Sequence, residues 1–510
     1  MASQRKQGVV LSYIFMALEI FSSIFFTPFL IRSFGQAEYG VYSLVNSVAA
    51  YLYLFDMGVG NSIVKYMAKY RVNGNAIKQG NVMFVSLLFY ALMGLLMLIV
   101  GLVLKANFPI IFGVGLSDEQ IEKAKIMFFI TLINMAITLV SSPLNKTILA
   151  YEKFTFSKTA DIIKICLRVL ISIVVLKFGG RAIAILTINL LMTVLFSLLA
   201  VVYNIKYIKV KPIAKQVDLS FIKEVFSFSF IVFVQMIATQ LNAMVDQVLM
   251  GIMLTSSAVI IGIYAIGAQF GTYLQSFASS VNGLLMPGVV KMVEQKESPV
   301  YIEKEMIRIG RVVFMLLSLI YCIFVVFGND FVKLWAGEEN SQAYYVGVII
   351  MFPLVFSLSQ AMGGQILWAM NRHKVQALLQ IIVALSNIVL TAIMIQWNPL
   401  LGASIATAIT YLVGNVGVQN IVFTKYIGIS MPRFYKGLFK GILPCIFGCV
   451  LAGVAVKLLK IDGWAGLTMH CSIMAGTYMC LMFWKGMNSY EKNLVLSMLG
   501  KVKINIQRSK

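Results

Sequence analysis

Long apolar runs alternate with short polar loops along the whole chain. An α-helix needs about 20 apolar residues to cross the roughly 30 Å of hydrocarbon in a bilayer. The pattern predicts fourteen spans of that length, and the fold class is therefore an all-α membrane protein with about 14 transmembrane helices. The spans are expected at 10–31, 41–63, 81–104, 126–148, 159–178, 182–203, 225–250, 259–285, 309–328, 344–369, 375–396, 401–423, 437–457 and 464–484.

A short polar turn at residues 34–42 belongs to an internal repeat. Its Tyr-Gly-Val-Tyr step at 39–42 returns as Ile-Gly-Ile-Tyr at 261–264, and Gly-Arg-Ala-Ile-Ala at 180–184 returns as Gly-Ala-Ser-Ile-Ala at 402–406. A repeat with an even number of spans returns the chain to its starting side, so the two copies have the same orientation. We expect two parallel six-helix lobes related by a pseudo-two-fold axis along the membrane normal. The expected divisions are an N-lobe at 1–220, a C-lobe at 221–435, two further spans within 436–487 and a basic cytoplasmic tail at 488–510.

Composition supports a membrane protein and excludes several other classes. The 510 residues are 60% hydrophobic and 12% charged, with a mean hydropathy of +0.87, which is too apolar for a soluble multidomain protein. Most of the 42 lysines and arginines fall on one side of the predicted spans, which places both termini in the cytoplasm. The net charge of +22 then forms a basic inner face against anionic lipid, and nucleic acid is not needed to explain it. The two histidines and six cysteines form no metal-binding pattern, and no phosphate-binding loop for ATP is present.

Charged residues inside the predicted spans are the first candidates for a functional site, because each costs about 2.5–3.5 kcal/mol to insert. In the span 159–178, Asp161, Lys164 and Arg168 are spaced by three and four residues and share one helical face. Arg168 is too deep to reach the inner interface easily, which favours an anion site in a wet cavity. A structural pair with Asp161 or Glu19 is the alternative, and for Lys164 extension to the inner interface is equally compatible.

Two further spans carry polar stripes, which are expected only where a helix meets water or other helices. Interhelical hydrogen bonding explains each stripe alone, whereas two stripes on adjacent spans favour a shared cavity. The candidates are Gln235, Asn242 and Asp246 on one span, and Gln269 and Tyr273 on the next. Glu19 and Asp246 are the candidate carboxylates for coupling transport to H⁺ or Na⁺, and plain pairing with Arg168 or Lys164 is an equal alternative for Glu19. Coupling is optional, because the membrane potential alone could drive export of a negatively charged substrate.

Several stretches together carry a family resemblance. They are the turn at 34–42 after a first span that contains Pro28, the segment 54–66, the loop 334–343 and the start of the twelfth span at 402–407. Because these stretches occur in this order, the chain resembles the polysaccharide-transport branch of the multidrug/oligosaccharidyl-lipid/polysaccharide exporter superfamily. Within that branch it resembles the Wzx-type O-antigen and capsule flippases. The resemblance implies two six-helix lobes around a central cavity that moves an undecaprenyl-diphosphate-linked oligosaccharide to the outer leaflet. It also implies cationic cavity residues for the diphosphate, a role we assign to Arg168 and Lys164, with Arg32 and Lys146 at span ends as further candidates.

The sequence thus predicts a flippase in the bacterial cytoplasmic membrane that breaks no covalent bond and needs no cofactor. Its expected partners are the lipid-linked oligosaccharide, anionic membrane lipid, and the polymerase and chain-length proteins of the same assembly route. Two alternatives remain. A cation-coupled multidrug exporter of the same fold would line its cleft with carboxylates and aromatics. A membrane-embedded polymerase or ligase would need catalytic residues on an outer loop, and all the loops here are short.

Overall fold

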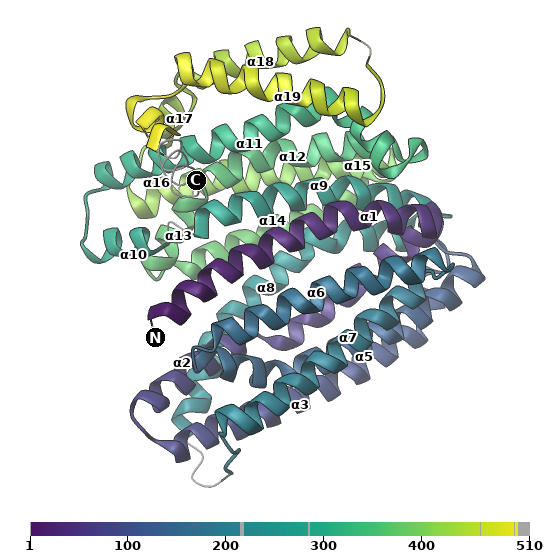
Figure 1. Cartoon of the computed structure of the whole chain (residues 1–510), viewed down its shortest axis with the longest axis vertical. Coiled ribbons are helices and arrows are strands. Elements are labelled where there is room, and N and C mark those ends of the chain that lie inside the picture. The colour runs from purple at the N-terminus through teal and green to yellow at the C-terminus, as the bar shows by residue number, and fades with distance from the viewer. Residues whose placement is uncertain (1, 215–218, 284–285, 460, 494, 498–510) are drawn as a thin grey trace, which may run out of the picture. The chain divides into compact units, whose positions relative to one another are not determined.

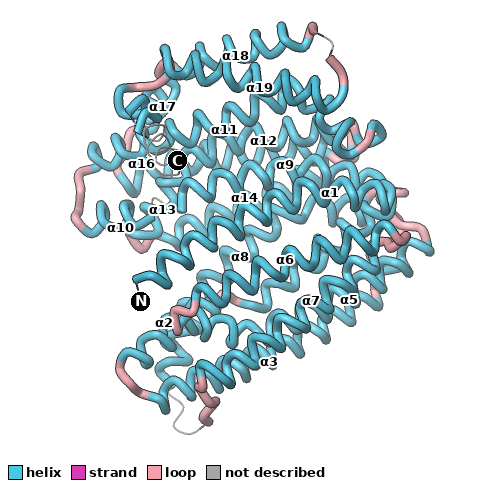
Figure 2. The backbone as a smooth tube through the Cα atoms, viewed as in Figure 1, coloured by secondary structure: helices cyan, strands magenta, loops and turns pink. Residues whose placement is uncertain are grey.

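The computed structural model describes residues 2–214, 219–283, 286–459, 461–493 and 495–497, and every regular element in these ranges is a helix (Figures 1 and 2). The all-α fold class is confirmed. In the described ranges nine helices are long and apolar enough to cross a membrane, or eleven if two bent pairs each count as one span. The fourteen expected spans are consistent with this set. The set counts two of them as one, because α1 (Ala2–Leu52) runs through both, and it includes neither the charged α6 (Phe154–Lys177) nor α8 (Leu219–Met253).

The helices form two compact units, Met1–Ala265 with Ala384–Ala403, and Ile266–Val383 with Ser404–Lys510. The expected lobe boundaries stay a prediction. The elements of the first unit, besides α1 and α6, are the 3₁₀ turn η1 (Tyr53–Asp56), α2 (Val59–Val72), α3 (Ala76–Ala106), α4 (Phe108–Phe112), α5 (Asp118–Ala150), α7 (Ala182–Tyr203), the π-turn η2 (Asn204–Ile208), α8 (Leu219–Met253), the start of α9 (Ala258–Gly283), the end of α14 (His373–Met394) and the start of α15 (Pro399–Thr410).

The second unit contains the rest of the chain, including the amphipathic helix α17 and the two helices α18 and α19 near the C-terminal end. Its elements are most of α9, α10 (Met286–Glu294), α11 (Pro299–Ala336), η3 (Glu338–Asn340), α12 (Ala343–Ser359), α13 (Ala361–Ala369), parts of α14 (His373–Met394) and α15 (Pro399–Thr410), the π-turn η4 (Tyr411–Val418), α16 (Gln419–Ile427), α17 (Met431–Phe439), α18 (Ile442–Lys457), α19 (Gly463–Leu481) and η5 (Met482–Gly486). Of the expected tail at 488–510, residues 494 and 498–510 lie outside the described part.

The repeated motif meets its own copy inside the first unit. Gly40 of α1 lies so close to α9 that a Cβ placed on it would be 1.6 Å from the carbonyl oxygen of Ala258 and 3.0 Å from the backbone nitrogen of Gly262. A Cβ on Gly262 would in turn be 2.8 Å from the carbonyl oxygen of Gln36. Only glycine allows two helices to approach this closely, which explains why both copies of the motif carry one.

The helical path of α1 breaks where the sequence predicts a turn, and breaks again after it. Gly35 has φ +76°, so the residues labelled α1 are two helices joined at this point. Further on, Met57 and Gly58 both have positive φ and separate η1 from α2. Asp56 beside this break accepts a hydrogen bond of 2.9 Å from the hydroxyl of Tyr90 on α3. The bond gives this carboxylate a hydrogen-bond partner between the two helices.

Three helices that carry polar residues pack together in the first unit. α5 begins with a capping box in which Ser117 and Gln120 bond each other's backbone, and it continues to Ala150. A turn at 151–153 leads into α6, and both α6 and α7 contact α5 (Figure 1). At the end of α7 the amide of Asn204 donates to the carbonyls of Ala200 and Leu144, which ties that end to α5. The three helices are therefore held together as one group, and polar residues from each of them line one cavity.

A buried arginine organises the last helices of the second unit. Arg311 of α11 is 5% exposed and donates to Glu491 at 2.6 Å and 3.1 Å. The same guanidinium donates to the backbone carbonyls of Gly437, Lys440 and Gly486 at 2.7–2.8 Å. Arg311 thereby joins the ends of α17 and η5 to Glu491, which follows η5. A charge that is paired and hydrogen-bonded in this way can be buried.

Candidate functional site

A cavity of about 260 Å³ lies among α5, α6 and α7 in the first unit. We call it the cationic cavity. It is lined by Thr138, Ser141, Asn145, Lys146, Ile148 and Leu149 of α5, by Phe156, Ser157, Lys158, Ala160, Asp161 and Lys164 of α6, and by Thr193, Phe196, Ser197, Leu199 and Ala200 of α7.

Charge in the cationic cavity is unbalanced. Three lysines, Lys146, Lys158 and Lys164, face one aspartate, Asp161, which leaves a net charge of +2 in the lining. Lys158 pairs with Asp161 at 3.2 Å, and Lys164 donates to the hydroxyl of Thr193 at 3.2 Å. Lys146 and Lys164 have no carboxylate within ion-pair distance among the described residues. The cavity therefore presents unneutralised ammonium groups next to neutral hydroxyl and amide groups.

The neutral polar lining comes from two further helical stripes. On α5, Thr138, Ser141 and Asn145 are spaced by three and four residues, and on α7 Thr193 and Ser197 are spaced by four, so each set shares a helical face. The hydroxyls of Ser141 and Ser197 lie 3.2 Å apart across the cavity wall. These residues and Lys158 were not among the sequence candidates, although the same spacing that singled out α6 is present on both neighbours.

Lys146 reaches the cavity past a glycine. A Cβ on Gly60 of α2 would lie 2.6 Å from Cε of Lys146 and 3.4 Å from its Nζ. The bare backbone of Gly60 thus leaves room for the lysine stem. Lys146, predicted only as a weaker candidate at the end of a span, is placed together with Lys164 in one cavity.

Arg168 lies one helical turn beyond Lys164 and is not part of the lining of the cationic cavity. It is partly buried, and its charge acts on Tyr42 of α1 and on Lys164. Neither Asp161 nor Glu19 forms an ion pair with it within the described part of the chain, and Asp161 instead pairs with Lys158. The structure thus places Arg168 beside the cavity, on the side where α6 packs against α1.

Asp246 belongs to a separate polar cluster. It is 5% exposed and accepts hydrogen bonds from the hydroxyl of Tyr264 and, at 2.8 Å, from the hydroxyl of Thr391 on α14. Thr391 is also 3.0 Å from the side-chain oxygen of Asn387, and both of these residues are completely buried. One turn before Asp246 on α8, the buried Asn242 has a side-chain oxygen with no hydrogen-bond partner among the described residues. A buried carboxylate among oxygen-bearing side chains can hold a proton or a small cation.

The remaining sequence candidates are dispersed. Gln235 is partly buried on α8, where its backbone carbonyl accepts from Thr239 at 2.9 Å. Glu19 and Arg32 are exposed on α1. Gln269 and Tyr273 lie on α9 in the second unit, and neither lines the cationic cavity. No group of three or more potential metal ligands occurs in the described residues.

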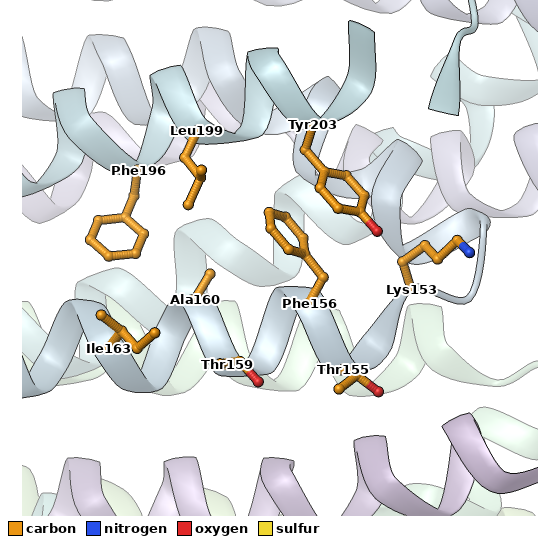
Figure 3. Close-up of a pocket in the computed structure, with 9 residues that line it drawn as sticks. All are labelled: Lys153, Thr155, Phe156, Thr159, Ala160, Ile163, Phe196, Leu199 and Tyr203. Atoms are coloured by element: carbon orange, nitrogen blue, oxygen red, sulfur yellow. The ribbon is translucent and has the colours of Figure 1, made fainter. Parts of the chain in front are cut away.

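A second hollow, of about 580 Å³, adjoins the cationic cavity between α6 and α7 (Figure 3). We call it the α6–α7 groove. It is lined by Lys153, Thr155, Phe156, Thr159, Ala160, Ile163, Phe196, Leu199 and Tyr203. Phe156 and Tyr203 stack with their ring centroids 3.6 Å apart, and apart from Lys153 the lining carries no charge. One polar and one apolar compartment therefore lie next to each other on the same pair of helices.

Comparison with protein families identifies the part of the chain that contains both compartments. The model of the family described as "Polysaccharide biosynthesis protein" matches residues 5–293, which include both compartments. The chain belongs to this family. The resemblance to the polysaccharide-transport branch of the exporter superfamily, expected from the sequence, is confirmed. The nine described helices that are long and apolar enough to cross a membrane agree with a multi-pass membrane protein.

Individual relatives extend the likeness over nearly the whole chain. A Bacillus subtilis (strain 168) protein described as "Uncharacterized membrane protein EpsK" is 22% identical over 495 residues, which are 95% of this chain and 96% of that protein. The solved structure of the lipid II flippase MurJ, in an inward closed conformation, has a TM-score of 0.69 and 14% identity and covers 96% of this chain and 99% of its own. An inward-facing multidrug resistance MATE family transporter has a TM-score of 0.64 and 14% identity, with coverage of 84% and 99%. The two structures establish a shared fold.

Proposed function

We propose that this protein carries a polyprenyl-diphosphate-linked oligosaccharide, such as an O-antigen, capsule or related repeat unit, from the inner to the outer leaflet of the bacterial cytoplasmic membrane. The observation that supports this most directly is the cationic cavity, with its net charge of +2 and its neutral hydroxyl and amide lining. Membership of a polysaccharide biosynthesis family and the fold shared with a lipid II flippase are consistent with it.

The lining matches the chemistry of a diphosphate headgroup. Phosphate oxygens carry two negative charges in the diester, and ammonium groups form short charge-assisted hydrogen bonds with them. Lys146 and Lys164 supply two such groups, while Asn145 and Thr193 supply neutral hydrogen-bonding partners of the kind that sugar hydroxyls require. Each unpaired polar group of the headgroup would cost several kcal/mol to transfer into hydrocarbon. In the cavity, the lysines, hydroxyls and amide replace the hydrogen bonds that the headgroup makes with water.

Membrane potential is sufficient to give the transport a direction. Moving one elementary charge across 100 mV changes its energy by about 2.3 kcal/mol, so two negative charges moved outward gain roughly 4–5 kcal/mol. At 1.4 kcal/mol per tenfold, this is a bias of about a thousandfold. Alternating access of two lobes would then suffice for export.

Asp246 provides a second route for energy input. Its buried carboxylate accepts hydrogen bonds from Tyr264 and Thr391, so protonation or cation binding at this point would change the bonding between α8, α9 and α14. A site that binds an ion only in one arrangement of these helices couples that ion to the transport cycle. In the proposed function, H⁺ or Na⁺ binding at Asp246 supplements the membrane potential.

The two alternatives are less well supported. A multidrug exporter for cationic compounds would be expected to expose carboxylates in its cleft, whereas Asp161, the aspartate that lines the cationic cavity, is paired with Lys158. For a polymerase or ligase, the acidic candidates Glu119, in the first turn of α5, and Glu338, in η3, are exposed and pair with Lys123 and Lys333, as solvated surface charges do.

The test uses the full-length protein in vesicles that contain a fluorescent polyprenyl-diphosphate-linked oligosaccharide. Export predicts that the label becomes accessible to an impermeant quencher at the opposite leaflet, faster when the membrane potential favours outward movement of negative charge. Cells that lack the protein should lose surface polysaccharide and keep their drug resistance. Efflux of a cationic dye without lipid translocation would instead assign the protein to the multidrug exporters.

A further inference from the structure

We propose that the α6–α7 groove holds the head-proximal part of a single polyprenyl chain while the diphosphate of the same molecule occupies the cationic cavity. The inference rests on the proposed function and adds to it where, and between which helices, the hydrocarbon chain of the substrate enters the protein.

The two compartments are adjacent because they share part of their lining. Phe156, Ala160, Phe196 and Leu199 line both. Figure 3 shows Phe196, Leu199 and Tyr203 extending from α7 toward α6, and Phe156 and Ala160 extending from α6 toward α7. The shared lining includes three side chains that can rotate, those of Phe156, Phe196 and Leu199. One ligand can occupy both spaces without separating the helices.

The groove opens where α6 and α7 present apolar side chains at the surface. Ile163, which lines the groove, is 45% exposed, and Leu199 is 41% exposed. Leu167 and Leu195 nearby on the same two helices are also exposed. In a membrane protein such a surface faces acyl chains, so a lipid chain can enter the groove from the side without crossing water.

Charge and chain number favour a polyprenyl diphosphate over a phospholipid. The net charge of +2 in the cationic cavity matches the two negative charges of a diphosphate diester, whereas an anionic phospholipid headgroup usually carries one. A polyprenyl lipid has one chain and a phospholipid has two. A groove of about 580 Å³ is within the range of ligand sites, roughly 300–1,000 Å³, and suits a segment of one chain.

The groove contributes position more than hydrophobic affinity, because surrounding lipid is as apolar as the groove itself. With the groove open, the first methylenes next to the diphosphate remain in apolar surroundings while the headgroup binds the lysines. If a larger side chain fills the groove, those methylenes would have to lie against the polar lining of the cationic cavity. Exposing roughly two of them weakens binding by about tenfold.

The experiment measures binding of a long-chain polyprenyl diphosphate and of inorganic diphosphate to the purified full-length protein. Ile163→Trp fills the groove without touching the cationic cavity, since Ile163 lines only the groove. Leu170→Trp is the matched control, because Leu170 lies seven residues further on the same face of α6, is 61% exposed and lines neither compartment. Lys164→Met reports on the headgroup site.

We expect Ile163→Trp to weaken polyprenyl diphosphate binding by about tenfold and to leave inorganic diphosphate binding unchanged. Leu170→Trp should change neither, and Lys164→Met should weaken both. Unchanged polyprenyl binding in Ile163→Trp, with the Lys164 effect intact, would overturn the groove proposal and leave the proposed function standing. Equal competition by phosphatidylglycerol vesicles would also overturn it, because the occupant would then be bulk phospholipid. If neither ligand depends on Lys164, the headgroup site itself fails.

Discussion

Lys164 has its ammonium group in the cationic cavity, and among the described residues this group donates to a neutral hydroxyl, that of Thr193, and to no carboxylate. Lys164→Met keeps most of the length and apolar volume of the side chain and removes the charge. Because methionine is an unbranched apolar side chain of similar length, the packing between α6 and α7 should change little. The substitution therefore tests the charge rather than the fold.

The size of the effect follows from the bond that is lost. A hydrogen bond from a charged donor contributes about 1.5–3 kcal/mol, and a unit charge about 4 Å from a phosphate at an effective dielectric constant near 20 contributes up to about 4 kcal/mol before desolvation. Removing the ammonium from Lys164 also takes away its own desolvation cost, so we expect a net loss of about 2 kcal/mol. This corresponds to a roughly 30-fold weaker apparent affinity for the lipid-linked oligosaccharide.

The assay compares the substrate dependence of translocation in vesicles for the wild type, Lys164→Met and Lys177→Met. Lys177 lies in the last turn of the same helix, is exposed and does not line the cavity, so it controls for loss of one positive charge from α6. Lys164→Arg should retain most of the affinity. Translocation that is equally sensitive to both methionine variants, or insensitive to both, would refute the assignment of the diphosphate to the cationic cavity.

Three further predictions follow from other parts of the first unit. Arg168→Ala should abolish export at normal protein abundance and Arg168→Lys should keep part of it; full surface polysaccharide in the alanine variant would remove this residue from the mechanism. Asp246→Asn should make vesicle transport independent of imposed proton or sodium gradients, and a persistent gradient dependence would exclude this carboxylate as the coupling group. Gly40→Val should lower the free energy of unfolding by about 1–3 kcal/mol, because the Cβ of the new valine would collide with the carbonyl of Ala258. Gly476→Val on α19 is the control and should be neutral, because a Cβ there meets open space. Equal melting temperatures for the two variants would contradict the close approach of α1 and α9 at Gly40.

The sequence by itself determined the class of protein and much of the helix pattern. Span length, the repeat of the glycine step and the spacing of Asp161, Lys164 and Arg168 are local properties, since a helix of known pitch places residues three and four apart on one face. For the same reason the turn at 34–42 could be predicted, and the structure breaks the helix there at Gly35. The family resemblance also depended only on short stretches in a fixed order.

Only the tertiary structure decided which faces meet. It placed Lys146, Lys158 and Lys164 from two helices in one cavity, paired Asp161 with Lys158 rather than with Arg168, and set Arg168 beside the cavity toward α1. It also brought Thr391, 145 residues away, to the carboxylate of Asp246. These choices depend on the packing of segments far apart in the chain, and the periodicity of one helix carries no information about which neighbour its polar face will contact.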